Sequence, residues 1–208
     1  MVDENIVRKV SVIFATDVVG YSKHMEADEN QTIKSLRRCE EILLKLFSKY
    51  DGRLFNTGGD SFLAEFQSAV SAIECAAEFQ QEVLNLNLSK ETKERLEFRI
   101  GINMGDVVKE KDNFLGDGVN IAARLEALAQ PNGITISKVI YDLVKSKTNF
   151  EFNDLGKQKV KQNEFHAYDI VLRKDQKRKL KTSSSQTFFK PVIAILGFIS
   201  AVCIILIY

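Results

Sequence analysis

The apolar and polar positions of the first hundred residues change period several times, and each period predicts one element. A continuous apolar run over 10–15 is typical of a buried strand. Apolar residues at helical spacing over 29–50 predict a helix, with Asp28 as its N-cap. Two short apolar runs then flank 57–60, where paired glycines permit the positive φ of a tight hairpin.

The pattern continues with a helical period over 69–84 and an alternating strand over 96–104. The expected order is strand, helix, strand, strand, helix, strand, which is the arrangement of a ferredoxin-like unit. Further elements are expected beyond it: a helix from Val119, a strand over 133–137, a helix over 138–147 and strands over 150–155 and 164–172. The predicted class is α+β, a ferredoxin-like βαββαβ core with extra C-terminal strands and helices.

Two acidic residues are expected to meet at one end of this sheet. Asp17 closes the first strand, and Asp60 lies at the hairpin tip, just before the third strand. Right-handed crossovers place the first and third strands side by side and antiparallel, so the two acids converge. Either acid alone is more often a turn residue or a cap. Together they favour a site for Mg²⁺, assigned to Asp17, Asp60 and the adjoining Val18.

The turn after Asp17 predicts phosphate binding. Its backbone N–H groups lie just before a helix, where phosphate oxygens are readily held. The residues assigned to the substrate phosphates are Val19, Gly20, Tyr21 and Ser22. A metal beside such a turn indicates nucleotide phosphate chemistry.

The helix expected from Val119 carries a polar pair. Asn120 and Arg124 lie four residues apart and so share one face. An amide and a guanidinium that project together suit a ribose and a phosphate. The alternative is a solvated Arg124 paired with Glu126 or another acid. Lys161 stands alone, and solvent exposure is its default interpretation.

Charge and composition narrow the class of protein. Lys and Arg (29) nearly balance Asp and Glu (28), so a nucleic-acid partner is not expected. Cys39, Cys75 and Cys203 lie far apart, which predicts buried free thiols in a reducing compartment. The N-terminus has no apolar signal run, so this part is not expected to be exported.

The C-terminal segment has a different composition. From Val192 to Tyr208 every residue is uncharged and nearly all are apolar, close to the lower limit of about 17 residues for a spanning helix. A buried core helix is the alternative, but such a helix has a polar face. The basic residues upstream predict a single-pass membrane protein whose main domain is cytoplasmic. The expected organisation is a domain over 1–173, a basic polar linker over 174–190 and a transmembrane helix over 191–208.

Four segments resemble one known family. ATDVVGYSKHMEADE, FNTGGDSFLAEF, FRIGINMGDVV and GDGVNIAARLEALAQPNGI follow one another within about 7–171. Together they resemble the catalytic domain of class III nucleotidyl cyclases, of the bacterial adenylate/guanylate type. The resemblance implies the class III cyclase fold and a phosphorus–oxygen lyase that works as a head-to-tail homodimer. Such an enzyme converts a nucleoside triphosphate, here expected to be ATP, into the 3′,5′-cyclic monophosphate and pyrophosphate.

The resemblance also implies a role for each candidate residue. Asp17 and Asp60 match the aspartates that hold two Mg²⁺ or Mn²⁺ ions. Asn120 matches the asparagine that orients the ribose, and Arg124 matches the arginine that stabilises charge at the α-phosphate. Lys161 matches the lysine that contacts the terminal phosphates. The implied site takes its metal pair from one protomer and these last three residues from the other.

The positions that read the base depart from the family pattern. Adenylate cyclases place a lysine, and guanylate cyclases a glutamate, four residues before the second metal aspartate, where this chain has Asn56. A later aspartate of the family is matched by Asn113. Asparagine both donates and accepts hydrogen bonds, so adenine fits, but guanine or a pyrimidine stays open. The alternative from another class is a catalytically silent, membrane-tethered module for dimerisation or nucleotide sensing.

Overall fold

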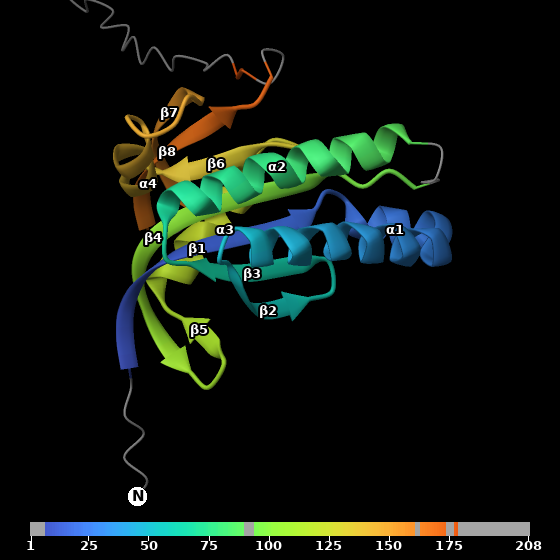
Figure 1. Cartoon of the computed structure of the whole chain (residues 1–208), viewed down its shortest axis with the longest axis horizontal. Coiled ribbons are helices and arrows are strands. Elements are labelled where there is room, and N and C mark those ends of the chain that lie inside the picture. The colour runs from blue at the N-terminus through green and yellow to red at the C-terminus, as the bar shows by residue number, and fades with distance from the viewer. Residues whose placement is uncertain (1–6, 90–93, 161–162, 174–176, 179–208) are drawn as a thin grey trace, which may run out of the picture. The chain divides into compact units, whose positions relative to one another are not determined.

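The computed structural model describes residues 7–89, 94–160, 163–173 and 177–178. Within them one mixed sheet is flanked by four helices (Figure 1). The elements in chain order are β1 Val7–Val18, α1 Tyr21–Lys49, β2 Arg53–Gly58, β3 Ser61–Phe66, α2 Ala69–Leu88, β4 Phe98–Glu110, β5 Asn113–Leu115, α3 Asp117–Leu128, β6 Ile134–Ser137, α4 Lys138–Val144, β7 Glu151–Val160 and β8 Asn163–Val171.

The strand order confirms the ferredoxin-like core. Across the described sheet the strands run β2-β3-β1-β4-β6-β8-β7, and β5 pairs with β4 off this path. β1 is antiparallel to β3, with Phe14 opposite Ala64, and antiparallel to β4, with Phe14 opposite Ile102. The first and third strands are therefore neighbours, as the crossover rule predicts.

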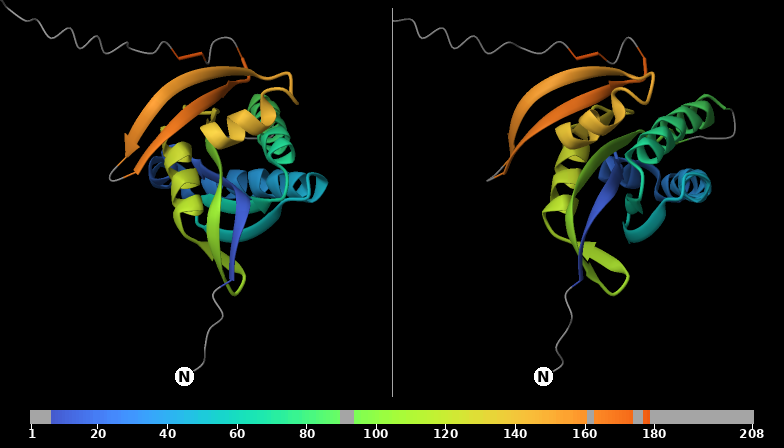
Figure 2. Two further views of the ribbon diagram at one scale, coloured as in Figure 1. Left: turned by 90° about the vertical axis from the view of Figure 1, so that its left-hand side faces the viewer. Right: turned by 60° about the vertical axis from the view of Figure 1, so that its left-hand side comes forward.

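The core lies on both faces of the sheet, with helices covering each (Figure 2). The larger cluster joins one face to α1, α2 and α4, and is built on rings such as Phe14, Phe47 and Phe66. The smaller cluster packs α3 through Ala122 against Ile13 and its neighbours on the other face. Alternating side chains of β1 thus serve two cores, which explains why 10–15 reads as a continuous apolar run.

Several boundaries differ from the sequence prediction. β1 and β4 extend beyond the apolar runs, and β5 was not predicted. The first helix begins at Tyr21 rather than near residue 29, and Asp28 interrupts it with φ −157° and ψ 92°. Asp28 nevertheless caps the second part, because its Oδ1 accepts the N–H of Gln31 at 3.0 Å. The predicted cap is confirmed, and the preceding helical turns were missed.

The C-terminal predictions fall largely outside the described residues. The chain divides into two units, Met1–Arg178 and Lys179–Tyr208, and no residue of the second is described. Of the predicted 174–190 linker only Lys177 and Arg178 are described, and the whole predicted transmembrane helix lies outside. In the part of the chain that the structure describes, no helix is both long and apolar enough to cross a membrane. Cys39 and Cys75 are buried free thiols, as expected, and burial raises the pKa of each to about 12.

Candidate active site

Asp17 and Asp60 line the same cavity, of about 370 Å³, at the end of β1. Asp17 is the penultimate residue of β1, and Asp60 follows Gly59 in the β2–β3 turn. Gly59 adopts φ +68°, a conformation that glycine reaches without the steric penalty of a Cβ. The remaining lining comes from the turn that enters α1 and from one residue of β4: Val18, Gly20, Tyr21, Ser22, Lys23 and Arg99. The predicted convergence of the two acids is therefore present.

The electrostatics of Asp60 show that the two carboxylates influence each other. Burial raises the pKa of Asp60 above its ordinary value, and the negative charge of Asp17 raises it further. Hydrogen bonds from backbone amides, including that of Val18, and the charge of Arg99 act in the opposite direction. A divalent cation bound beside Asp60 would oppose this rise in its pKa, because a positive charge favours the ionised carboxylate.

Arg99 and Glu126 are the members of this site that sequence reasoning missed. Arg99, on β4, donates through Nε to Asp17 Oδ1 at 3.0 Å and through Nη2 to Asp17 Oδ2. Its Nη2 also lies 3.2 Å from Glu126 Oε1, on α3. Burial, and next the hydrogen bond to Asp17, raise the pKa of Glu126 to about 8. At neutral pH Glu126 therefore keeps its proton, and Arg99 is the cation that balances Asp17.

The carboxylate pair fits a hard divalent ion, although it does not form a complete cage. Among the described residues no group of three or more His, Cys, Asp or Glu side chains could hold a metal. Mg²⁺ commonly binds through one or two carboxylates and takes its other ligands from water and phosphate oxygens. Asp17, Asp60 and the adjoining Val18 are the residues that would hold such an ion, with phosphate oxygens of a triphosphate completing its ligands.

The turn after β1 keeps part of its predicted capacity for phosphate. The Val19 N–H donates to Glu97 O at 2.8 Å, so it is not free to meet a phosphate oxygen. Gly20 is the N-cap residue of α1. Its φ of 66° lies in the left-handed region, and a glycine has no side chain that could cap the first N–H groups of the helix. Within the described chain, no backbone hydrogen bond outside the regular elements is recorded for the N–H groups of Gly20, Tyr21 and Ser22. These three positions, beside the carboxylate pair, match the predicted phosphate turn.

Asn120 and Arg124 lie on α3, outside the set of described residues that line the Asp17 cavity. Asn120 is exposed and Arg124 is partly buried. Oε1 of Glu126 lies 3.2 Å from Nη2 of Arg99 and not against Arg124, whose Nη1 is buried without a hydrogen-bond partner among the described residues. A buried unpaired guanidinium nitrogen is costly unless an acceptor arrives from outside the chain. The prediction that Arg124 acts at a partner's metal pair stays a prediction.

The two amides assigned to the base lie next to one aromatic contact. Asn56 on β2 follows Phe55, and Asn113 on β5 precedes Phe114. The two rings meet edge to face, with centroids 5.0 Å apart. β2 and β5 are thereby joined, although neither pairs with the other as a strand. Asn113 Oδ1 accepts the Phe114 N–H at 2.8 Å. Lys161 lies outside the described residues.

The motifs and this geometry agree with what comparison finds. The model of the family "Adenylate and Guanylate cyclase catalytic domain" matches residues 2–175. This chain belongs to that cyclase family. Residues 2–175 are its cyclase domain.

Relatives of the cyclase domain include whole proteins and solved structures. It is 43% identical over 162 residues to putative adenylate cyclase 3 of Rhizobium meliloti (strain 1021), a match that covers 77% of this chain and 28% of that protein. The chain thus spans less than a third of that relative. The adenylate/guanylate cyclase/hydrolase of Silicibacter pomeroyi superposes with a TM-score of 0.74 at 35% identity, over 80% of this chain and 99% of that one. The adenylyl cyclase CyaB of P. aeruginosa shares the fold, with a TM-score of 0.71 at 24% identity, over 83% and 98% of the two chains.

Proposed function

We propose that this chain converts ATP into 3′,5′-cyclic AMP and pyrophosphate, within a homodimer. The observation that carries the proposal is the meeting of Asp17 and Asp60 in one cavity, in a chain that belongs to the cyclase family. The relatives named as adenylate cyclases support ATP as the substrate.

The roles of the chain's own groups follow from their chemistry. Asp17, Asp60 and Val18 would hold two Mg²⁺ or Mn²⁺ ions, which when bound supply Lewis-acid activation of the ribose 3′-hydroxyl and charge neutralisation at the phosphates. The N–H groups of Gly20, Tyr21 and Ser22 hold phosphate oxygens beside them. Lys161 contacts the terminal phosphates.

The position of the remaining groups supports a homodimer. Asn120 orients the ribose, and Arg124 donates to the α-phosphate as its negative charge grows. Both lie outside the cavity of their own Asp17, which supports a site that the second protomer completes with these two residues. The unpaired Nη1 of Arg124 supports this, because a phosphate oxygen from a substrate held by the partner would satisfy it.

A product assay tests the proposal. The full-length chain is incubated with each of the four nucleoside triphosphates and Mn²⁺, and cyclic product is quantified by mass. Cyclic AMP from ATP is the expected result. Cyclic product from GTP or a pyrimidine nucleotide only would keep the chemistry and change the base, which the neutral amides of Asn56 and Asn113 allow. Tight nucleotide binding without turnover in a folded dimer would instead favour a silent sensing module.

We also propose that residues 191–208 anchor the chain in a membrane, with the cyclase domain in the cytoplasm. The support is the uncharged run after a basic segment in the sequence. Fractionation of cells that express the full chain tests it. Recovery in the membrane pellet after carbonate washing is expected for residues 1–208 and loss of that recovery for residues 1–178.

A further inference from the structure

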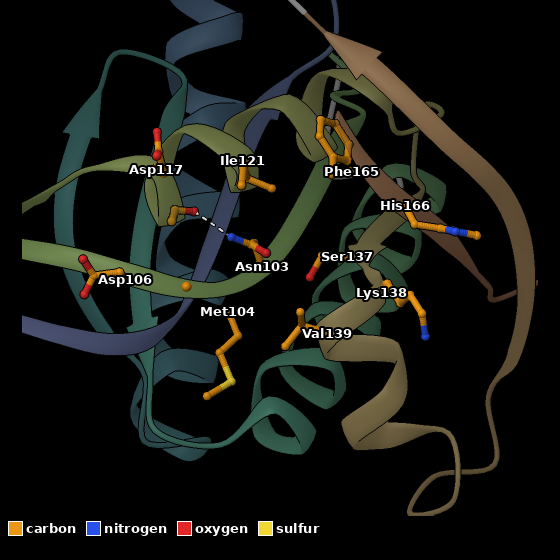
Figure 3. A pocket seen from close by; sticks show the side chains of 12 residues that line it. Asn103, Met104, Asp106, Asp117, Ile121, Ser137, Lys138, Val139, Phe165 and His166 are labelled. Carbon is orange, nitrogen blue, oxygen red and sulfur yellow. Dashed lines mark hydrogen bonds between the residues drawn. The ribbon is translucent and has the colours of Figure 1, made fainter. Parts of the chain in front are cut away.

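A second cavity, of about 350 Å³, lies beside β4, just beyond the point where its pairing with β6 ends (Figure 3). β6 pairs with β4 only as far as Ile102, and β5 pairs with β4 only from Val108 onward. Between these two points no described strand covers this edge of β4. The cavity shares no lining residue with the one that contains Asp17 and Asp60.

The uncovered edge of β4 presents backbone hydrogen-bonding groups to this cavity. Ile100 donates its N–H to Gly133 O at 3.1 Å, toward the β6 side. Because N–H and C=O groups alternate sides along a strand that pairs antiparallel with β1, those of Met104 point the same way. The Met104 backbone therefore offers one donor and one acceptor at the cavity.

Two buried polar side chains add a second donor and acceptor. Asn103 is 3% exposed, and its Nδ2 donates to Gly118 O at 3.1 Å, which leaves Oδ1 without a recorded partner among the described residues (Figure 3). Ser137 is 4% exposed and accepts the Ile140 N–H at 3.5 Å, which leaves its hydroxyl hydrogen free to donate. A buried polar group that can still form a hydrogen bond favours the binding of a ligand that supplies the partner.

The other walls are apolar. Of the four titratable side chains that line the cavity, three are already paired, whereas the exposed Asp117 has no ion pair among the described residues. Apolar contact comes from Met104, Ile121, Val139 and Phe165. At the rim, Lys138 pairs with Asp142 at 2.5 Å, His166 with Asp154 at 2.5 Å and Asp106 with Arg8 at 3.0 Å. Asp117 would repel an anion, and any charged ligand would have to compete with the three pairs. A neutral ligand would not, so the cavity favours a neutral molecule with a flat apolar face.

We propose that this cavity binds a neutral nucleoside, with the edge of its base against β4. A base edge carries adjacent donors and acceptors, as the Met104 backbone, Asn103 and Ser137 do, and its faces are apolar. The volume lies within the usual range of about 300–1,000 Å³ for small-molecule sites. α3 contributes Asp117, Gly118 and Ile121 to the wall. The ligand therefore contacts the helix that carries Asn120 and Arg124, and the site does not depend on cyclase activity.

Methionine methyl signals distinguish the two cavities. The chain has three methionines, Met1, Met25 and Met104. Met104 lines the proposed site, and Met25 follows the α1 entry turn that lines the Asp17 cavity. The full-length chain, labelled with ¹³C-methyl methionine and kept in mild detergent, is titrated with adenosine to millimolar concentration. Met104→Leu assigns the reporter signal.

The expected result is a saturable shift of the Met104 methyl with adenosine and weaker binding of AMP. Val139→Trp fills the mouth and should weaken adenosine binding by roughly tenfold or more, which is about 1.4 kcal/mol. Leu143→Trp is the matched control, because Leu143 is the other exposed apolar residue of α4 and does not line the cavity. Asp60→Ala should leave the Met104 shift unchanged, since it alters only the other site.

Three outcomes would overturn the proposal. They are an unmoved Met104 signal at millimolar adenosine, an equal affinity in the Val139→Trp chain, and a shift that disappears in the Asp60→Ala chain. The last would assign the nucleoside to the metal cavity. Because the readout is a methyl shift, a chain that lacks cyclase activity can still support the site, and an active one can still refute it.

Discussion

Arg99 binds both oxygens of the Asp17 carboxylate: Nε donates to Oδ1 at 3.0 Å, and Nη2 donates to Oδ2. Asp17 is one of the two acids assigned to metal binding, so a cation must share this carboxylate with the guanidinium or displace it. We therefore expect Arg99 to lower the affinity of this carboxylate for a metal ion.

Arg99→Ala is expected to tighten Mn²⁺ binding to the nucleotide-free chain by roughly tenfold, since loss of a competing cation a few ångströms away is worth on the order of 1 kcal/mol at a partly exposed site. Titration followed by Mn²⁺ electron paramagnetic resonance measures this. Arg8→Ala, which removes an exposed arginine paired with Asp106, should leave Mn²⁺ affinity unchanged. Weaker Mn²⁺ binding in Arg99→Ala would mean that Arg99 orients Asp17 for the metal.

Asp60→Ala is expected to abolish metal-dependent activity without unfolding the chain. Asp60 lies in a turn, and burial together with the charge of Asp17 already disfavours its ionised form. Circular dichroism melting should show an unchanged or slightly raised Tm. Ser61→Ala is the control, because Ser61 Oγ donates to Gly58 O at 2.9 Å within the same turn. It should cost about 1 kcal/mol at most and keep Mn²⁺ binding. Unfolding of Asp60→Ala would give the acid a structural role instead.

Arg124→Ala is expected to lower kcat by on the order of 10²-fold or more and to leave nucleotide binding largely intact, as loss of a transition-state donor does. Steady-state kinetics and equilibrium binding of a non-reactive analogue separate the two effects. Arg124→Lys keeps the charge but not the planar fork, so partial activity is expected. An unchanged kcat in Arg124→Ala would exclude the residue from the site.

The pair Asn56→Lys and Asn113→Asp is expected to shift the ratio of kcat/KM values toward ATP over GTP, because the neutral amides at these positions both donate and accept. Competition between the two triphosphates, with cyclic products counted by mass, measures the ratio. Each single change provides the control, and the effects should be non-additive because the flanking rings are in contact. A ratio that does not move would assign base selection to other residues.

Glu126→Gln is expected to change how stability depends on pH. The folded chain holds the Glu126 proton up to about pH 8, whereas the unfolded chain releases it near the ordinary value of 4.5. Between these values the folded state binds more protons, so the free energy of unfolding falls as pH rises. The advantage of Glu126→Gln over the original chain should therefore grow from about pH 4.5 to pH 8 and then stay constant.

Urea unfolding in the presence of a chelator measures this difference, and the chelator removes any contribution from metal at Asp17. Glu82→Gln, on the exposed side of α2, controls for the loss of a surface carboxylate. A difference that stays flat across the range would show that Glu126 titrates alike in both states.

Periodicity and crossover handedness were enough to predict the core of the fold and the meeting of Asp17 with Asp60, because both follow from backbone rules. β5 and the far half of β4 escaped prediction. Lys109 and Glu110 are exposed and charged, although β4 here lies between β1 and β5, so this stretch has no apolar alternation to detect. The first turns of α1 were missed because Asp28 interrupts the helical period.

Side-chain contacts across elements could not be predicted from spacing. Arg99 is 82 residues from Asp17, and nothing local marks it as more than a strand residue. A charged side chain inside an apolar strand was the available signal. Glu126 was considered only as a neighbour of Arg124 on one helix, whereas the fold turns it toward β4. Likewise, the sequence could not show that Nη1 of Arg124 lacks a hydrogen-bond partner, because this depends on which groups the fold buries around it.

One contact fixes how far α3 stands from the sheet. A Cβ on Gly101 would lie 2.1 Å from Glu126 N and 2.2 Å from Ala122 O, so only a hydrogen fits between strand and helix. Gly101 lies two residues beyond Arg99 on β4, and α3 carries both Glu126 and Arg124. The absence of a Cβ at Gly101 thus sets the spacing between β4, which carries Arg99, and α3, which carries Arg124, the residue proposed to act at a second subunit's site. A bulkier residue at position 101 would push α3 away from β4, and would therefore displace Glu126 and Arg124 relative to Arg99 at the same time.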